Sequence, residues 1–139
     1  MKSAYALLML IVVSATSIVS CSDDNAVQGD VADRKDGKLA TAMVTEQGGG
    51  GATVPWVQRV YVGHSDTHVH VEVLKAIHTR DLAIIWSGDR RLTVYMACGE
   101  ILSFTNLVDI YSADRKSFQR IEIELNANGL CSESWPPGS

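Results

Sequence analysis

Four side chains able to bind a metal or carry a proton recur at every second position in one short stretch of the sequence. They are His64, Asp66, His68 and His70. In one continuous β-strand, side chains two residues apart project from the same face. Imidazoles and a carboxylate on one face could provide ligands for zinc or copper. One hypothesis is therefore a metal-binding module built on these four residues.

The same stretch has a second interpretation. His64 and Asp66 fall in a Gly-His-Ser-Asp sequence typical of a turn, so their side chains need not follow the direction of the strand. Same-face neighbours on one strand also lie about 6–7 Å apart, too far to share a metal without convergent rotamers. The histidines would then be the solvated face of a half-buried strand.

The element that must position these residues is a β-hairpin. Residues 57–62 are rich in valine, and Val69, Val71 and Val73 alternate with polar residues. This two-residue period indicates strands with one buried face. Residues 63–66 provide the turn between the two strands.

Three further strands and one helix are predicted after this hairpin. Residues 82–86 form a continuous apolar run, which indicates a strand covered on both faces or a short buried helix. Residues 92–96 and 118–125 alternate and predict two more strands. Between them, apolar residues at three- and four-residue spacing over 101–111 predict an amphipathic helix. The pattern predicts an α+β fold of about five strands and one helix, either an antiparallel sheet or a small OB-like barrel.

The composition divides the chain of 139 residues into three segments. Residues 1–20 contain one early lysine, an apolar run and then small residues, which is the layout of a secretory signal. Residues 21–55 are rich in Asp, Gly, Ala, Thr and Gln and lack aromatic residues, which favours a flexible tether. Residues 56–139 are then predicted to form one small domain.

Residues 18–21, Ile-Val-Ser-Cys, resemble the lipobox of bacterial lipoproteins. The resemblance implies that Cys21 is acylated and becomes the new N-terminus, which anchors the protein to a membrane. Ser22, rather than Asp, after this cysteine resembles lipoproteins sent to the outer membrane, where the domain would face the periplasm or the cell surface. The alternative is cleavage by the ordinary signal peptidase after Ala15, which leaves Cys21 free.

The chain has three cysteines, an odd number for a secreted protein. If Cys21 carries lipid, Cys98 and Cys131 remain, and an oxidising periplasm would let them pair. Such a disulfide would close a loop of about 30 residues and contribute ~3–4 kcal/mol to stability. The alternative is two buried free thiols.

Charge and motif content argue against several classes of function. The net charge is −4 and no run of basic residues occurs, which disfavours binding to nucleic acid. Nothing near Cys98 indicates a lowered thiol pKa, and Glu122 and Glu124 alternate along a strand as its solvated face. The four glycines at 48–51 lack the context of a phosphate-binding loop. We therefore expect a non-enzymatic protein without a cofactor.

Two stretches resemble the B subunits of subtilase cytotoxin and typhoid toxin. Residues 60–67, Val-Tyr-Val-Gly-His-Ser-Asp-Thr, look like their strand-turn-strand opening, and residues 107–123 resemble their helix leading into an alternating strand. Those subunits are OB folds that assemble as pentamers and bind sialylated glycans, so the resemblance implies these properties here. A serine upstream of their first strand contacts the sugar, and Thr53 lies at the same offset from Asp66.

Aromatic residues supply the last argument about function. Trp56 and Trp135 lie at the edges of the predicted domain and are candidates for exposure, and aromatic faces stack on sugars and anchor protein interfaces. We therefore predict a membrane-tethered binding module for a glycan or a protein partner. The candidate ligand-binding residues are Thr53, Trp56, Asp66, His68 and His70. The alternatives are the metal-binding module and a structural lipoprotein that self-associates as a homo-oligomer.

Overall fold

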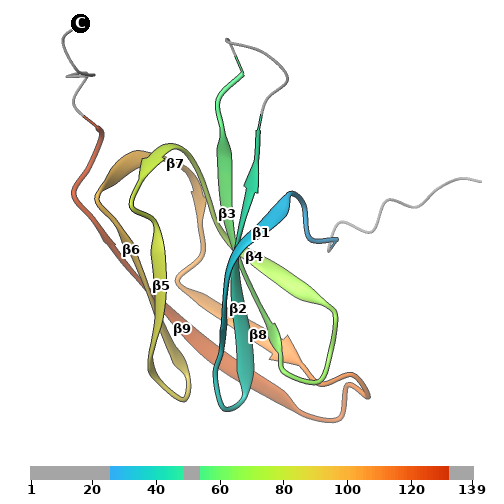
Figure 1. Cartoon of the computed structure of the whole chain (residues 1–139). Coiled ribbons are helices and arrows are strands. Elements are labelled where there is room, and N and C mark those ends of the chain that lie inside the picture. The colour runs from blue at the N-terminus through green and yellow to red at the C-terminus, as the bar shows by residue number, and fades with distance from the viewer. Residues whose placement is uncertain (1–25, 49–53, 132–139) are drawn as a thin grey trace, which may run out of the picture.

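The computed structural model describes residues 26–48 and 54–131, and its regular structure there is entirely β-strand (Figure 1). Nine strands occur in these residues: β1 (Asp30–Asp36), β2 (Ala40–Gln47), β3 (Val57–His64), β4 (His70–Arg80), β5 (Ala83–Gly88), β6 (Arg91–Met96), β7 (Cys98–Phe104), β8 (Leu107–Tyr111) and β9 (Phe118–Ala127). No helix long and apolar enough to cross a membrane is found in this described part of the chain.

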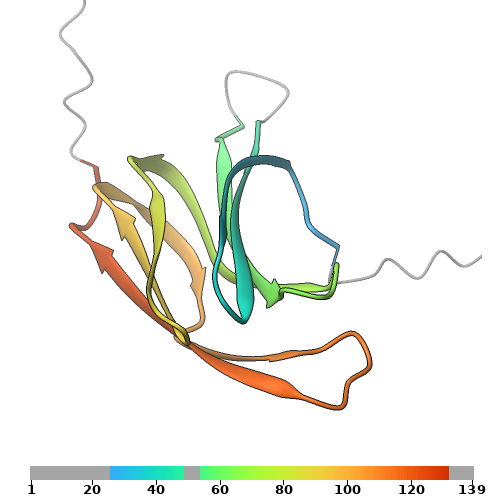
Figure 2. The same ribbon diagram turned by 60° about the horizontal axis from the view of Figure 1, so that its bottom comes forward.

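The strands form two sheets (Figure 2), and buried residues of both sheets make up the core. The five-stranded sheet has the order β1-β2-β3-β4-β7, and the four-stranded sheet has the order β5-β6-β9-β8. Neighbouring strands are antiparallel except β6 and β9, which are parallel. Val60 and Leu74 from the first sheet meet Ile84, Leu92 and Ile121 from the second in one buried cluster. Burying each of these side chains stabilises the fold by about 1.5–3 kcal/mol.

The predicted hairpin is confirmed, because β3 and β4 pair in antiparallel register. β4 is longer than the valine alternation indicated and continues to Arg80. Residues 82–86 belong to strand β5, but its Ile85 is 52% exposed, so only one face of this strand is buried. The strands predicted at 92–96 and 118–125 are confirmed as β6 and β9.

The predicted helix over 101–111 is wrong, and the α+β fold class is wrong with it. This segment contains the end of β7, a turn, and all of β8. Within β8 the buried residues are Val108 and Ile110, two positions apart, as a strand requires. The helical spacing arose because residues of two strands on either side of a turn were counted together. Ile101 and Phe104, which contributed to it, are 40% and 38% exposed.

The predicted tether over 21–55 is also wrong for the part that the structure describes as strands. β1 and β2 lie within it, and β2 is buried along most of its length between β1 and β3. Its small residues Ala40 and Ala42 fit against the core without the bulky side chains that mark most strands. Gln28, just before β1, accepts a hydrogen bond from the Thr45 hydroxyl at its carbonyl oxygen, at 2.6 Å. The folded domain therefore begins about 30 residues earlier than predicted.

The predicted disulfide is confirmed between Cys98 and Cys131, whose Cα atoms are 4.8 Å apart. It joins the first residue of β7 to the chain that follows β9. The predicted signal segment 1–20, Cys21, Thr53 and Trp135 lie outside the described residues.

Candidate functional site

The structure separates the predicted ligand-binding residues into two groups. Trp56 immediately precedes β3, whereas His64 is the last residue of that strand. An eight-residue strand spans about 25 Å, so Trp56 lies at the opposite end of the sheet from Asp66, His68 and His70. The two groups therefore belong to different sites.

The histidine group does not form one set of ligands. His64 Nδ1 lies 2.5 Å from Asp66 Oδ1, within the loop after β3. His70 is 7% exposed, and its Nδ1 lies 2.9 Å from the carbonyl oxygen of His68. No cluster of three or more His, Cys, Asp or Glu side chains able to hold a metal occurs in residues 26–48 and 54–131. The prediction of a shared face required one continuous strand from His64 to His70, but β3 ends at His64 and β4 begins at His70, with a loop between them.

Gly63 explains how His70 comes to be buried. These two residues are opposite each other in the β3–β4 ladder. A Cβ atom on Gly63 would lie 2.6 Å from Cδ2 of the His70 ring and 2.6 Å from the Val69 carbonyl oxygen. Because Gly63 has no side chain, the His70 imidazole can pack against the backbone of β3.

At the other end of β3, Trp56 borders a groove of about 490 Å³. The groove is lined by Glu46, Val54, Pro55, Trp56, Gln58, His78 and Thr79. Trp56 is 64% exposed, which agrees with the exposure predicted for it. A Cβ atom on Gly48 would come within 2.9 Å of the Trp56 Cη2 atom, so the indole lies directly against the Gly48 backbone. Gly48 thus packs against the indole ring, and much of the surface of the ring remains exposed to solvent.

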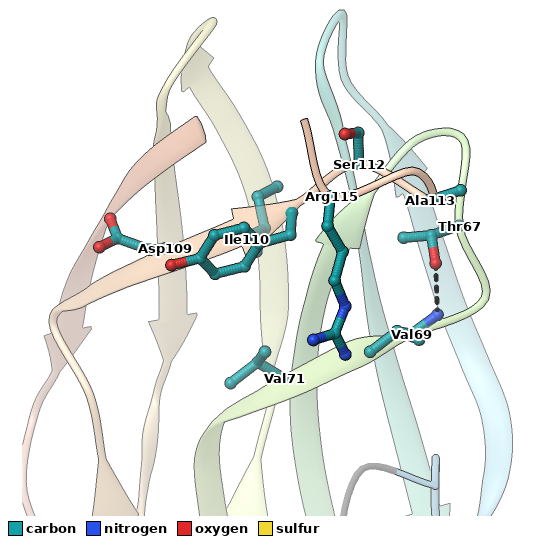
Figure 3. A pocket seen from close by; sticks show the side chains of 9 residues that line it. Thr67, Val69, Val71, Asp109, Ile110, Ser112, Ala113 and Arg115 are labelled. Atoms are coloured by element: carbon teal, nitrogen blue, oxygen red, sulfur yellow. Dashed lines mark hydrogen bonds between the residues drawn. The ribbon is translucent and has the colours of Figure 1, made fainter. Parts of the chain in front are cut away.

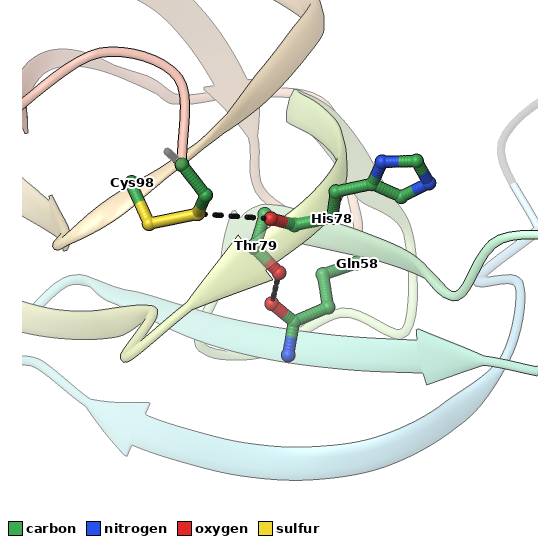
Figure 4. Close-up of a disulfide and its surroundings, with 5 residues drawn as sticks. Gln58, His78, Thr79 and Cys98 are labelled. Atoms are coloured by element: carbon green, nitrogen blue, oxygen red, sulfur yellow. Dashed lines mark hydrogen bonds between the residues drawn. A yellow bond between two sulfur atoms is a disulfide. The ribbon is translucent and has the colours of Figure 1, made fainter. Parts of the chain in front are cut away.

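The wall beside the indole is a chain of polar side chains from three adjacent strands. The Gln58 side-chain amide donates to Glu46 Oε1 at 2.5 Å across the β2–β3 ladder. The Thr79 hydroxyl donates in turn to Gln58 Oε1, as Figure 4 shows. These hydrogen bonds fix which end of the Gln58 amide faces which neighbour. The groove therefore presents a carboxylate and an amide in set orientations next to an aromatic ring.

The disulfide lies next to His78, which lines the groove. His78 has a left-handed backbone, with φ of +51°, close to the end of β4. Cys131 Sγ lies 3.3 Å from the His78 carbonyl oxygen (Figure 4). This is a packing contact, because a disulfide sulfur carries no proton to donate. Cys98 is paired with Arg80 in the β4–β7 ladder, so the bond ties the end of β4 to the C-terminal chain.

Sequence reasoning missed most of this groove. Glu46 fell in the predicted tether, and its role becomes visible only when β2 pairs with β3. Gln58 and Thr79 are 21 residues apart and carry no motif. Only Trp56 had a signal of its own, which was an aromatic residue at a predicted domain edge.

No protein-family model matches this chain, and no curated protein or solved structure matches it either. The resemblance to the lipobox therefore stays a prediction. Residues 107–123, likened to a helix and strand of the toxin B subunits, contain β8 in place of the helix, so only the stretch 60–67 still supports that resemblance.

Proposed function

We propose that this protein is a lipid-anchored lipoprotein of the bacterial cell envelope whose β domain binds a glycan in the groove beside Trp56. The observation that carries the proposal is the exposed indole, supported by Gly48 and bordered by the Glu46 carboxylate and the Gln58 amide. A sugar ring has an apolar face of C–H groups and an edge of hydroxyls. The first matches an aromatic face, and the second matches oriented hydrogen-bonding groups.

The acidic content of the groove favours binding over hydrolysis. Among its described lining residues Glu46 is the only carboxylate. Glycoside hydrolysis commonly needs two carboxyl groups that flank the scissile bond. Glu46 already accepts a hydrogen bond from Gln58, which suits a residue that orients a ligand. We therefore propose a non-enzymatic module.

The proposed anchor at Cys21 has a geometric consequence. Gln28 is bound to the domain, so residues 22–27 alone connect it to the acylated cysteine. Even fully extended, the seven Cα-to-Cα steps from Cys21 to Gln28 span no more than about 25 Å. The domain would therefore be held close to the membrane, at the outer-membrane surface that Ser22 suggests. We expect its glycan to be one carried at or near that surface.

A glycan array with the mature protein in detergent tests the proposal. The wild type is expected to bind a defined subset of glycans. Trp56→Ala should weaken that binding at least tenfold, which corresponds to about 1.4 kcal/mol. Tyr95→Ala is the matched control, because Tyr95 is 41% exposed but lies on β6, away from the groove. An array without any bound glycan, or equal losses in both variants, would contradict the proposal.

A protein partner is the second candidate. Leu107, Tyr111 and Phe118 are about half exposed, and the rings of Tyr111 and Phe118 are 5.9 Å apart between their centroids. They lie on the β8–β9 pair, where Tyr111 and Phe118 are direct cross-strand partners. Exposed aromatic residues of this kind are enriched in protein interfaces. Chemical cross-linking in intact envelopes, with Phe118→Ser as the comparison, distinguishes this function from glycan binding.

A further inference from the structure

A second cavity, of about 600 Å³, lies at the opposite end of β3 from the Trp56 groove. Residues of the β3–β4 hairpin form one side, and residues of β8 with the loop after it form the other (Figure 3). It is lined by Thr67, Val69, Val71, Asp109, Ile110, Tyr111, Ser112, Ala113 and Arg115. We propose that this cavity binds a small organic carboxylate with an apolar body, and that Arg115 holds the carboxylate. The proposal does not depend on the function of the Trp56 groove.

The backbone at Arg115 is fixed in an unusual conformation. Its φ is +57°, in the left-handed region that a residue with a Cβ atom rarely adopts. The surrounding loop enforces this geometry, because the Arg115 amide donates to the Ser112 carbonyl at 2.9 Å and the Ser112 amide donates to the Ser117 carbonyl at 3.0 Å. A strained residue held by its neighbours is typical of functional positions. Figure 3 shows the guanidinium directed into the cavity, toward Val69 and Val71.

The acidic residues around the cavity are occupied by other partners. Asp109 accepts two hydrogen bonds from Arg120, at 2.7 and 2.9 Å, and this lowers the pKa of Asp109. Asp114 accepts hydrogen bonds from the Ser112 hydroxyl, at 2.6 Å, and from the Lys116 amide, and these lower its pKa.

Asp66, in the loop after β3, also lies near the cavity. Its Oδ1 lies beside His64 and accepts a hydrogen bond from the Ala113 amide at 3.3 Å. That bond joins the two loops that enclose the cavity. Arg115 belongs to none of the ion pairs found between described residues. Its guanidinium is therefore a positive charge that a ligand can neutralise.

The rest of the lining defines the chemical class of the ligand. Val69, Val71 and Ile110 provide aliphatic surface, and the half-exposed Tyr111 provides an aromatic wall. Such surface favours an apolar ligand body. One guanidinium balances one negative charge, and its planar fork matches the two oxygens of a carboxylate. A phosphate dianion would leave an unbalanced charge beside Asp109 and Asp114.

Isothermal titration of the full mature protein tests the proposal, with 4-phenylbutyrate as the probe. The wild type is expected to bind it in a saturable way. It should bind 4-phenylbutyramide, which has no charge, and acetate, which has no large apolar group, at least tenfold more weakly. Arg115→Gly should weaken binding of 4-phenylbutyrate at least tenfold. Glycine adopts this φ without strain, so this variant should keep its melting temperature or gain a little.

Lys116→Gln is the matched control, because it removes the same charge from the neighbouring position and leaves the Lys116 amide in place. It should bind 4-phenylbutyrate as the wild type does, and so should Trp56→Ala. Unaltered binding in Arg115→Gly would overturn the proposal. Equal binding of the acid and its amide, or no saturable binding of any probe to the wild type, would overturn it as well.

Discussion

The two ends of β3 carry cavities built in different ways. The Trp56 groove is formed mainly by strand residues, and its polar lining includes a neutral amide, a hydroxyl and one carboxylate joined by hydrogen bonds across the ladder, together with His78. The Arg115 cavity is formed largely by two loops, and its character comes from one guanidinium without a counter-charge above aliphatic side chains. The first suits an uncharged ligand rich in hydroxyls, and the second suits an amphipathic anion. One sheet thus offers two chemically distinct surfaces, far enough apart to be altered independently.

The largest expected effect comes from removing the disulfide, which is near the Trp56 groove only. With a separation of 33 residues, replacing both Cys98 and Cys131 by Ala should lower the free energy of unfolding by about 4 kcal/mol. Glycan binding should also weaken, because the wall at His78 loses its attachment. Binding of 4-phenylbutyrate should not change. Urea denaturation together with both binding assays measures this, and a loss confined to the Arg115 cavity would contradict it.

At the hairpin end, Gly63→Ala should be the most damaging small substitution. The added methyl group would meet both the His70 ring and the Val69 backbone at 2.6 Å, and the backbone cannot move aside cheaply. We expect a loss of about 2 kcal/mol in stability and weaker binding of 4-phenylbutyrate. Gly88→Ala is the control, because nothing lies within 4 Å of its added Cβ atom. Similar melting temperatures for the two variants would show that the hairpin does not need a glycine at position 63.

Gly48→Ala makes the corresponding change at the other end, with a smaller effect. The three atoms nearest to its Cβ atom all belong to the Trp56 ring, the closest at 2.9 Å, and that side chain can rotate away. The expected cost in stability is below about 1 kcal/mol, because an exposed side chain can repack. The displaced indole should nevertheless weaken glycan binding several-fold. If thermal unfolding and the glycan affinity are both unchanged, the support of the ring by Gly48 has no role.

Acidification should produce the smallest effect, and mainly at the hairpin end. Hydrogen bonds lower the pKa values of Asp109 and Asp114 below the ordinary value of about 3.9. A carboxylate with a lowered pKa in the folded state stabilises the fold above its ordinary pKa, and this contribution is lost as the pH falls through the lower folded value. Stability should therefore decline below about pH 4.

Asp109→Asn should remove part of that decline, because the substituted side chain no longer titrates. Urea midpoints measured between pH 7 and pH 2.5 for the wild type and this variant provide the comparison. Parallel curves for the two proteins would show that the pairing of Asp109 with Arg120 does not contribute to acid sensitivity.

The sequence was informative where a local pattern determined the structure. The valine alternation around residue 70 and its turn predict the β3–β4 hairpin, and the two cysteines left by the lipobox argument predict the disulfide. It was misleading where structure depends on distant partners. β2 has small residues and little hydrophobic signal, and it is a strand because β1 and β3 pair with it. The segment 101–111 has helical spacing but forms the end of β7 and β8, which pair with β4 and β9.

The candidate sites follow the same rule. Trp56 could be recognised as an exposed aromatic residue, but Glu46 joins it only through the β2–β3 register. No sequence pattern indicated that Arg115 lines a ligand site, because the cavity forms only when two distant loops come together. The hydrogen bond between Asp66 and Ala113 joins these loops across 47 residues of sequence. The positive charge of that cavity comes from Arg115 because Arg120 is already paired with Asp109. The composition of the sequence does not show which arginine is paired.

An NMR titration of the mature protein with a glycan found on the array tests the central claim most directly. The indole N–H of Trp56 and the side-chain amide of Gln58 are expected to shift as the glycan is added. The indole N–H of Trp86, which donates to the Lys35 carbonyl oxygen at 2.9 Å, is expected to stay in place as an internal reference. If the glycan saturates the protein while the Trp56 and Gln58 signals do not move, the Trp56 groove is not the glycan-binding site.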